Sequence, residues 1–359
     1  MNTTIIEKIK LMNFRSHSEY DLDCDKKTTL ILGENGWGKT SVLEAIYIAL
    51  QGKSFRAADG EIIKREEEFY RVELDYKTGE KVVVVSEVSG GGYIDSKEKT
   101  GKTPLQVGDK KTKKTFLIRD KKTARLPKAQ KYPVILFLPE DLHLIVTSPT
   151  KKREYFDRLI NQLDDKYSVI LSRYNKVLKQ RNEALKNEFI SEDSLFSWNI
   201  MLAKYGVDLR KKRQQVVEMI NKRLTETYQT IADNEDKVAI DYKSYTGEVD
   251  ESEYLRLLAM DFERDRITGH TNFGVHRDDY EFVFNGVLAN GSASRGEVRS
   301  IILALKFIEA ELVEDARQKK PLVLLDDVFS ELDKDRQKSL VKNFKNHQVI
   351  LTSVEGVEL

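Results

Sequence analysis

The 359-residue chain contains a single cysteine, Cys24, only six prolines and no long apolar stretch. One cysteine excludes a disulfide framework and any zinc site built on a CxxC pair, and it is typical of a protein in a reducing compartment. The longest aliphatic runs, Val82–Val85 and Leu322–Leu325, fall far short of the ~20 residues that span a bilayer. The N-terminal segment also lacks the apolar core of a secretion signal. The sequence therefore predicts a soluble, cytoplasmic protein with no membrane partner.

Net charge is nearly absent as well. The chain has 60 lysines and arginines against 59 acidic residues, which gives a net charge of +1. This balance excludes a polycationic, histone-like protein. It does not exclude a nucleic-acid partner, because such partners recognise local concentrations of charge and not the total.

Basic residues do concentrate locally. Residues 97–131 contain thirteen lysines and arginines and three acids, a local net charge of +10, and smaller basic clusters lie at 151–153 and 210–213. Such clusters predict salt-sensitive contacts with DNA phosphates, with a solvated charged surface as the alternative. Phe116 is the only aromatic residue between Tyr93 and Tyr132, which favours duplex DNA over stacking on single strands. The candidate DNA-binding residues are Lys110, Lys111, Lys113, Lys114, Lys121, Lys122, Lys151, Lys152 and Arg153.

Strand and helix signals divide the chain into regions. Short apolar runs near both ends, such as Thr28–Leu32, predict buried strands of an α/β domain. Between about residues 150 and 232, proline is absent and apolar residues recur every three or four positions, which predicts a helical hairpin or a small bundle. The simplest arrangement is an α/β domain formed by residues 1–140 and 270–359, with an inserted helical arm domain of residues 141–269.

A glycine-rich sequence, GENGWGKT, stands between a predicted strand and a predicted helix. Its glycines allow backbone N–H groups to surround a phosphate chain, and the helix N-terminus adds a favourable dipole. Lys39 would reach the β- and γ-phosphates, and the hydroxyl of Thr40 would bind Mg²⁺. The alternative is a chance glycine loop. The candidate ATP-binding residues are Gly33, Glu34, Asn35, Gly36, Trp37, Gly38, Lys39 and Thr40.

Two aspartates follow the apolar run Leu322–Leu325. A fully apolar strand is typical of a parallel sheet, and ligands bind at the carboxyl ends of such strands. Asp326 is therefore a candidate ligand for the same Mg²⁺ as Thr40, and Asp327 is placed to orient or deprotonate an attacking water. A helix N-cap or a solvated turn is the alternative.

A third sequence, SASRGE, precedes an amphipathic helix that is predicted to run from Gly296 to about Arg317. Serines before a helix are most often caps. The functional alternative is that Ser294 and the amide of Gly296 bind a γ-phosphate at the helix N-terminus.

These motifs, GENGWGKT, SASRGEVRS and LLDDVFSELD, occur in an order that resembles the ABC-type head shared by the SMC and Rad50 ATPases. The likeness is greatest to the RecF family of bacterial recombination mediators. Three further stretches are similar to RecF sequences: LMNFRSH at 11–17, PEDL at 139–142 and GVHRDD at 274–279.

The resemblance implies an ABC-type P-loop ATPase head, with a mixed sheet and helices, and a helical arm. It implies that the signature residues Ser294, Arg295, Gly296 and Glu297 close on ATP bound to a second copy of the chain, so that ATP promotes a homodimer. Ser330 and Asp333 would belong to the D-loop of that interface. Asp327 stands where related ATPases carry a catalytic glutamate, and Thr352-Ser353 stands where many carry a switch histidine.

The function implied by this resemblance is that of a weak, DNA-stimulated ATPase that uses ATP and Mg²⁺. It would bind duplex DNA and single-strand/double-strand junctions at gaps, and assist RecA loading together with RecR and RecO. The processes concerned are DNA repair, replication restart and the SOS response. Two alternatives stay open: an ABC-type ATPase of a defence or transport system that does not act on DNA, and a nucleotide-gated scaffold whose hydrolysis is incidental.

Overall fold

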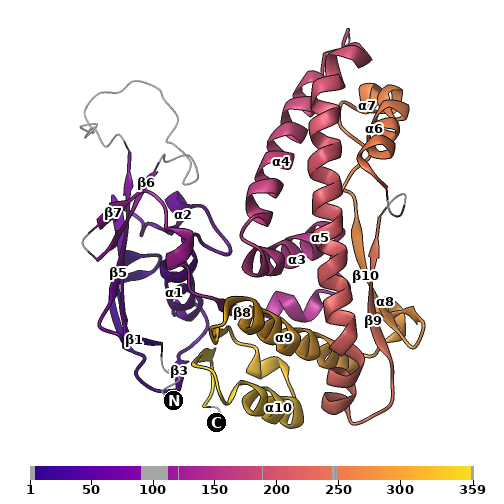
Figure 1. Ribbon diagram of the computed structural model, residues 1–359. Helices are drawn as coiled ribbons and strands as arrows, with labels where there is room; N and C mark the ends of the chain where they lie inside the picture. The colour runs from indigo at the N-terminus through magenta and orange to yellow at the C-terminus, as the bar shows by residue number, and fades with distance from the viewer. Residues whose placement is uncertain are drawn as a thin grey trace. The chain divides into compact units, whose positions relative to one another are not determined.

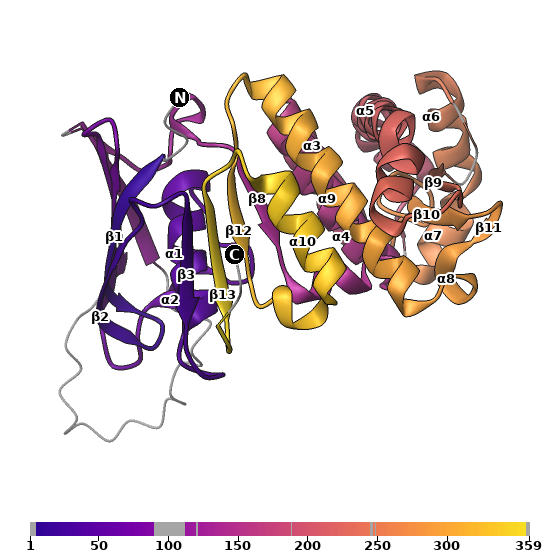
Figure 2. The same cartoon turned by 90° about the horizontal axis from the view of Figure 1, so that it is seen from below.

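The computed structural model describes residues 5–89, 112–119, 121–187, 189–244, 247 and 249–356. The chain forms two compact units (Figures 1 and 2). Unit 1 consists of Met1–Pro139 and Gln318–Leu359, and unit 2 consists of Glu140–Arg317. In the described part of the chain, no helix is both long and apolar enough to cross a membrane.

The first sheet of unit 1 is antiparallel, with six strands in the order β2-β1-β4-β5-β6-β7. Its side chains alternate: Ile9 and Leu11 are buried, whereas Lys10 and Met12 between and after them are exposed. This period of two is expected of a sheet that is covered on one face. The strands are β1 (Ile6–Phe14), β2 (His17–Asp23), β4 (Phe69–Tyr76), β5 (Lys81–Val88), β6 (Thr112–Ile118) and β7 (Lys121–Thr123).

The second sheet of unit 1 is parallel, with the order β3-β13-β12-β8. Its central strands are buried on both faces: β12 is apolar throughout, and β13 is apolar up to Thr352 and Ser353 at its carboxyl end. Leu325 pairs with Leu351 and Phe137, so the strands end at a common edge. The elements are β3 (Thr28–Leu32), β8 (Val134–Phe137), β12 (Leu322–Leu325) and β13 (Val349–Ser353), with α10 (Lys334–Phe344) and the 3₁₀ turns η1 (Lys128–Gln130) and η3 (Phe329–Glu331).

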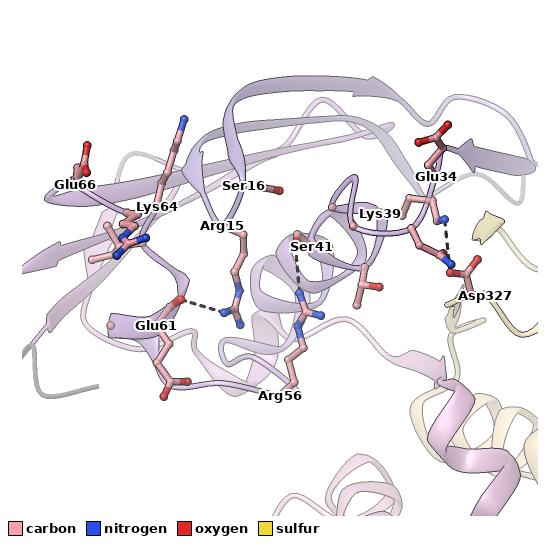
Figure 3. Close-up of a pocket in the computed structure, with 17 residues that line it drawn as sticks. Arg15, Ser16, Glu34, Lys39, Ser41, Arg56, Glu61, Lys64, Glu66 and Asp327 are labelled. Atoms are coloured by element: carbon pink, nitrogen blue, oxygen red, sulfur yellow. Dashed lines mark hydrogen bonds and ion pairs between the residues drawn. The ribbon is translucent and has the colours of Figure 1, made fainter. Parts of the chain in front are cut away.

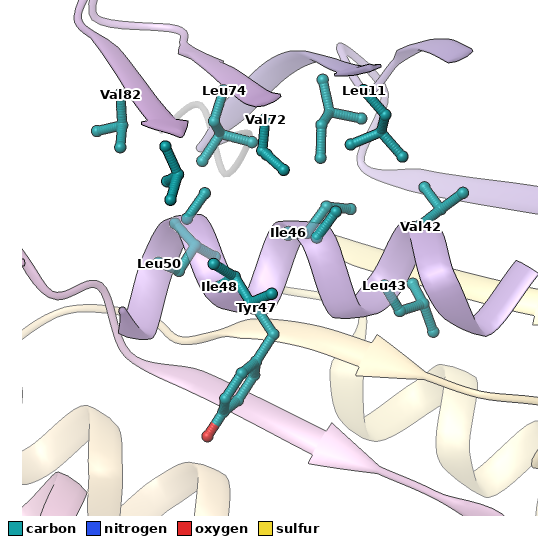
Figure 4. Packing of buried hydrophobic residues seen from close by; sticks show 14 of the residues in the cluster. Leu11, Val42, Leu43, Ile46, Tyr47, Ile48, Leu50, Val72, Leu74 and Val82 are labelled. Atoms are coloured by element: carbon teal, nitrogen blue, oxygen red, sulfur yellow. The ribbon is translucent and has the colours of Figure 1, made fainter. Parts of the chain in front are cut away.

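Helix α1 (Lys39–Gln51) lies between the two sheets and forms the centre of the unit 1 core (Figure 4). Val42 and Ile46 point towards the antiparallel sheet, whereas Leu43 and Tyr47 point away from it, towards the parallel strands. A helix that packs on both sides is apolar all round. The short helix α2 (Asp59–Ile62) follows it in the chain.

Unit 2 is organised around α5, a helix of 41 residues that packs against α4, α6, α9 and β9. A three-stranded antiparallel sheet has the order β11-β10-β9. The elements are η2 (Pro139–His143), α3 (Pro149–Leu163), α4 (Tyr167–Ala184), α5 (Glu192–Ala232), β9 (Val238–Lys243), α6 (Glu251–Met260), α7 (Phe262–Thr268), β10 (Asp279–Phe284), β11 (Val287–Leu288), α8 (Ala289–Ser292) and α9 (Arg295–Arg317).

The α/β class and a mainly helical inserted unit are as predicted, and the two compact units divide the chain at other residues than the predicted domains. Residues 270–317 were expected in the α/β domain and belong instead to unit 2. The reason is tertiary: β10 pairs with β9 over six residues, and α9 packs along α5. The SASRGE segment at the start of α9 is therefore part of unit 2, whereas the P-loop is part of unit 1.

A buried arginine joins the helices at one end of unit 2. Arg181 of α4 is 0% exposed and donates to Asp265 of α7, Asn199 of α5 and the hydroxyl of Thr271, each at 2.7 Å. Asp265, also 0% exposed, accepts from the backbone and side chain of Asn272 with its other oxygen. An ion pair this deep persists because its charges are hydrogen-bonded on both sides.

Arg181→Ala should lower the free energy of unfolding of unit 2 by about 3–5 kcal/mol, because it leaves the buried charge of Asp265 without its cation. Trp198, on α5 beside Asn199, reports this unfolding in urea once Trp37, the only other tryptophan, is replaced by Phe. Lys176→Ala, at an exposed position of the same helix, is the control and should change stability by less than about 0.5 kcal/mol. Equal losses in both variants would contradict the prediction.

Candidate nucleotide-binding site

The P-loop between β3 and α1 has the backbone that its glycines permit. Gly36 and Gly38 have φ angles of 85° and 94°, in the left-handed region. A Cβ on Gly38 would lie 2.5 Å from Nε2 of His17 and 2.6 Å from the hydroxyl of Ser16, so no other residue fits there. Gly38 is the N-cap of α1, no side chain caps the helix, and its first turn has no acid. The N-terminal amides of α1 thus face the loop as an anion-binding end.

Lys39 is held at the base of this loop. Its side chain is only 4% exposed, and Nζ donates to the carbonyl of Gly33 at 2.7 Å. The same Nζ lies 3.6 Å from Oδ2 of Asp327. The lysine charge is therefore positioned between the start of the loop and the end of β12.

Asp326 connects three segments of unit 1. Its Oδ1 accepts from the hydroxyl of Thr40 at 2.9 Å and from that of Thr352 at 2.8 Å. Burial raises the pKa of its carboxyl, the two hydroxyl bonds oppose that shift, and the charge of Asp327 adds to it. A carboxylate with a raised pKa gains when a cation binds beside it.

Asp327 is held in a sparsely populated conformation. Its φ is 48°, and its N–H donates to the hydroxyl of Thr352 at 2.9 Å. Its Oδ1 is buried and has no hydrogen-bond partner among the described residues. A strained residue with an unsatisfied carboxylate oxygen is more typical of a functional position than of a structural one.

A cavity of about 700 Å³ opens in front of these residues (Figure 3). This volume is in the range of small-molecule sites. One wall is the P-loop with Asp327, and the opposite wall carries Arg15, Arg56 and Lys64. Of the predicted ATP-binding residues, Glu34, Asn35, Gly36, Gly38, Lys39 and Thr40 line the cavity.

Trp37, unlike the P-loop residues that line the cavity, packs on the outer side of the loop. Its ring packs edge-on against His17 and Tyr20, with centroids 6.0 and 5.8 Å away, and it covers Gly33. His17 in turn donates from Nε2 to the carbonyl of Gly38 at 3.1 Å. Trp37 is 49% exposed and supports the loop from outside the cavity.

Glu44 holds two cavity arginines, and the sequence alone did not identify it. It is 0% exposed, on α1. Its carboxylate accepts two bonds from Arg15 and two from Arg56, at 2.9–3.0 Å, and one from Ser54 at 2.5 Å. Burial alone would raise the pKa of Glu44, but these bonds hold it below its ordinary value. A lone acid in an otherwise apolar helix was the available signal, because a buried carboxylate needs partners.

The signature and D-loop residues form hydrogen bonds with residues a few positions away in the chain. Ser294 and Glu297 form a capping box at the start of α9: the Ser294 N–H donates to the glutamate at 2.6 Å, and the Glu297 N–H donates to the serine hydroxyl at 3.3 Å. Arg295 is exposed and Gly296 is half-buried. In unit 1, Ser330 donates to the carbonyl of Asp327 at 2.7 Å, and Asp333 caps α10.

The candidate DNA-binding residues separate into groups. Lys113, Lys121 and Lys122 are exposed, whereas Lys114 is paired with Asp59 at 2.6 Å. Lys151 pairs with Glu154, and Arg153 donates to the carbonyl of Asp278. Lys152 is 8% exposed and lies 3.4 Å from Asp279, so the structure corrects its assignment to DNA. Lys110 and Lys111 lie outside the described residues.

The basic cluster at 210–213 is likewise mostly internal. Arg210 is 4% exposed and pairs with Asp278, and Arg213 is 2% exposed and pairs with Asp157. Lys212 pairs with Asp164, which leaves Lys211 as the exposed member. These arginines maintain the fold of unit 2.

Comparison with known proteins shows the family of the chain. A family model described as an AAA domain matches residues 8–239. The DNA replication and repair protein RecF of Clostridium acetobutylicum is 31% identical over 97% of this chain and 92% of its own length. RecF of Ruminiclostridium cellulolyticum is 32% identical with the same coverages.

Solved structures give the same result. A structure of "the recombination mediator protein RecF-ATP in RecFOR pathway" superposes with a TM-score of 0.83 at 27% identity, over 100% of this chain and 94% of that one. The corresponding RecF-ATPrS structure gives a TM-score of 0.82, over 98% of this chain and 92% of that one.

The fold and the site thus define an ATP-binding P-loop ATPase with an AAA domain. Within that class, the chain belongs to the RecF family of DNA replication and repair proteins. The family resemblance predicted from the motifs is confirmed.

Glu44→Gln should weaken ATP binding at least several-fold, because a neutral amide no longer orients both arginines. It should also lower the free energy of unfolding by about 1.5–3 kcal/mol at pH 7, since the charge-assisted bonds from Arg15 and Arg56 lose their buried carboxylate acceptor. Isothermal calorimetry and urea unfolding measure the two effects. Glu67→Gln, which removes the charge of a half-buried carboxylate that among the described residues accepts from Asn13 alone, is the control.

The stability effect has a defined pH dependence. The folded pKa of Glu44 is lowered, so its contribution is complete above its unfolded pKa of about 4.3 and is lost as the pH falls through the folded value. The difference in stability between wild type and Glu44→Gln should therefore shrink below about pH 4.3. A difference in stability that stays constant into that acidic range would contradict this role of Glu44 in holding Arg15 and Arg56.

Proposed function

We propose that this chain is an ATP-dependent DNA-binding mediator of recombination. Binding of ATP and Mg²⁺ at the P-loop joins two copies of the chain, the dimer binds duplex DNA and single-strand/double-strand junctions at gaps, and slow, DNA-stimulated hydrolysis releases it. The observation that carries the proposal is the convergence of Lys39, Thr40 and Asp327 on one cavity, with Lys39 3.6 Å from Asp327 and Thr40 hydrogen-bonded to the buried Asp326 behind it. The similarity to the solved structures of the recombination mediator protein RecF supports it further.

The donor atoms at the site suit Mg²⁺. Thr40 and Asp326 offer a hydroxyl and a carboxylate oxygen 2.9 Å apart, and both are hard oxygen ligands. Oδ1 of Asp327 is a further unpartnered oxygen beside them. Bound there, Mg²⁺ would neutralise charge on the phosphates.

The chain's own groups perform the remaining work. The amides of the P-loop and the ammonium of Lys39 hold the phosphate oxygens. Asp327 orients a water molecule and accepts its proton, while Thr352 fixes both aspartates through its hydroxyl. Arg15 and Arg56, oriented by Glu44, add positive charge on the opposite wall.

Dimerisation is proposed through the signature. Ser294 lies in unit 2, and its hydroxyl oxygen accepts from the Glu297 amide, which leaves the hydroxyl proton available to a phosphate oxygen. A γ-phosphate on a second copy would supply that acceptor. RecR and RecO are the further partners that family membership suggests, in a pathway that leads to RecA loading in repair, replication restart and the SOS response.

Asp327→Asn should retain ATP binding within a few-fold but lower the hydrolysis rate by about 100-fold or more, because it removes the general base and keeps the shape. Nucleotide affinity is measured by calorimetry and turnover by phosphate release. Lys39→Ala is the matched variant and should lose ATP binding itself. If Asp327→Asn also supports DNA repair in cells at the wild-type level, the nucleotide-gated scaffold with incidental hydrolysis is the better description.

The DNA role is tested by titrating a gapped duplex with the protein, with and without ATP, from 50 to 200 mM salt. We expect ATP to increase the affinity and salt to decrease it steeply. Sedimentation of the same samples should show an ATP-dependent dimer. If no ATP-stimulated, salt-sensitive binding is found, the chain is better described as an ATPase that does not act on DNA.

A further inference from the structure

The exposed side of α4 carries three basic residues, spaced three positions apart. Arg173, Lys176 and Lys179 are exposed, whereas Tyr174 and Val177 between them are buried. The one acid of this fully described helix, Glu183, is held by Lys186 at 2.9 Å. We call Arg173, Lys176 and Lys179 the α4 basic face.

This face differs from the basic clusters that stand out in the sequence. Lys152, Arg210 and Arg213 are buried in ion pairs, so their charges are neutralised within unit 2. Among the described residues no ion pair is found for Arg173 or Lys176, whereas the charge of Lys179 helps to lower the pKa of the Glu183 carboxyl. Exposed cations that are not matched by carboxylates attract polyanions over a distance of about one Debye length.

The polar residues around the face indicate the kind of anion. Ser172, Asn175 and Gln180 are exposed beside the basic residues. Together with lysine and arginine, these are the side chains that contact phosphates in nucleic-acid complexes. The exposed side of α4 has no aromatic residue, so it offers no stacking platform for single-stranded bases. It also lacks the aromatic anchors that are typical of protein interfaces.

The histidine against the buried side of α4 adds no charge to this helix. The hydroxyl of Tyr174, which is buried, donates to Nδ1 of His276 at 2.8 Å. Burial lowers the pKa of His276 to about 4, and the charges of Arg277 and Arg153 act in the same direction. His276 is therefore neutral at physiological pH.

We propose that the α4 basic face binds the phosphate backbone of duplex DNA, independently of base sequence. This inference rests on the proposed DNA-binding function and names a surface for it on unit 2. Residues 173 and 179 are separated by about 9 Å along a helix that rises 1.5 Å per residue. Phosphates follow one another every ~3.4 Å of axis on one DNA strand, so the face suits two or three of them.

The test replaces all three residues together, as R173Q/K176Q/K179Q, in the full-length protein with ATP. Binding to a fluorescent 30-base-pair duplex is followed by anisotropy between 50 and 200 mM salt. If each residue neutralises one phosphate, the slope of log K against log[salt] should become shallower by about 2–3, and the affinity at 100 mM salt should fall at least tenfold. Thermal unfolding should be unchanged, since the three side chains are exposed.

The matched control is K204Q/K222Q/K237Q, which removes three exposed lysines of unit 2 that lie outside the predicted DNA-binding clusters. Exposed acids lie near these lysines in the chain, namely Asp208, Glu218 and Glu235, so the control removes the same charge from the same unit without removing the α4 basic face. The control should retain the wild-type slope. Equal effects of the two triple variants, or an unchanged slope in the α4 variant, would overturn the inference.

Two further outcomes separate the inference from the function on which it rests. If the wild-type protein does not bind duplex at all, the proposed DNA function fails before the face is tested. If the wild type binds and the α4 variant binds equally well, only the face is refuted. Poly-L-glutamate of matched charge serves as a competitor: competition as strong as that of unlabelled duplex would indicate an acidic protein as the natural partner, and would also overturn the inference.

Discussion

A buried carboxylate, Asp326, fixes the geometry on which the nucleotide site of unit 1 depends. It accepts hydrogen bonds from Thr40 at the start of α1 and from Thr352 at the end of β13, so it joins segments that are 286 and 26 residues away in the chain. The parallel register of β3, β13 and β12 brings these segments to one edge. A buried carboxylate is stable there because two hydroxyl groups solvate it, and this requirement aligns the P-loop with Asp327.

The same requirement, that a buried charged group needs partners, applies to the basic residues of the chain. Unit 2 places Arg181, Arg210 and Arg213 in its interior, each against an aspartate. In unit 1 the buried partner is the acid: Glu44 is 0% exposed and holds Arg15 and Arg56, which stay partly exposed at the cavity. These pairs position backbone and side chains at the cost of removing charge from the surface. A net charge near zero therefore conceals two populations of cations, and only the exposed, unmatched ones bear on a polyanionic partner.

The sequence predicts a structural feature well when residues close together in the chain determine it, and poorly when distant residues do. The P-loop and the strand before Asp326 were predictable, because glycines at fixed offsets and an apolar run are local signals. Glu44, Arg56 and Thr352 were not, because their partners are distant in the chain or lie in another element. That residues 270–317 belong to unit 2 was not predictable for the same reason, because it depends on β10 pairing with β9 and on α9 packing along α5. The burial of Lys152 was not predictable, because a cluster of charges in the sequence does not indicate which member faces inward.

The division of the chain also constrains how ATP acts in the proposed cycle. The groups that surround the phosphates, Lys39, Thr40 and Asp327, all belong to unit 1, whereas Ser294 belongs to unit 2. A ligand shifts an equilibrium only by as much as its affinities for the two states differ. If the P-loop holds the β-phosphate in either state, only the γ-phosphate would distinguish the two states, through the proposed contact with Ser294 of a second copy. Hydrolysis would remove that one group, so the proposed switch would need a single chemical step to release the DNA.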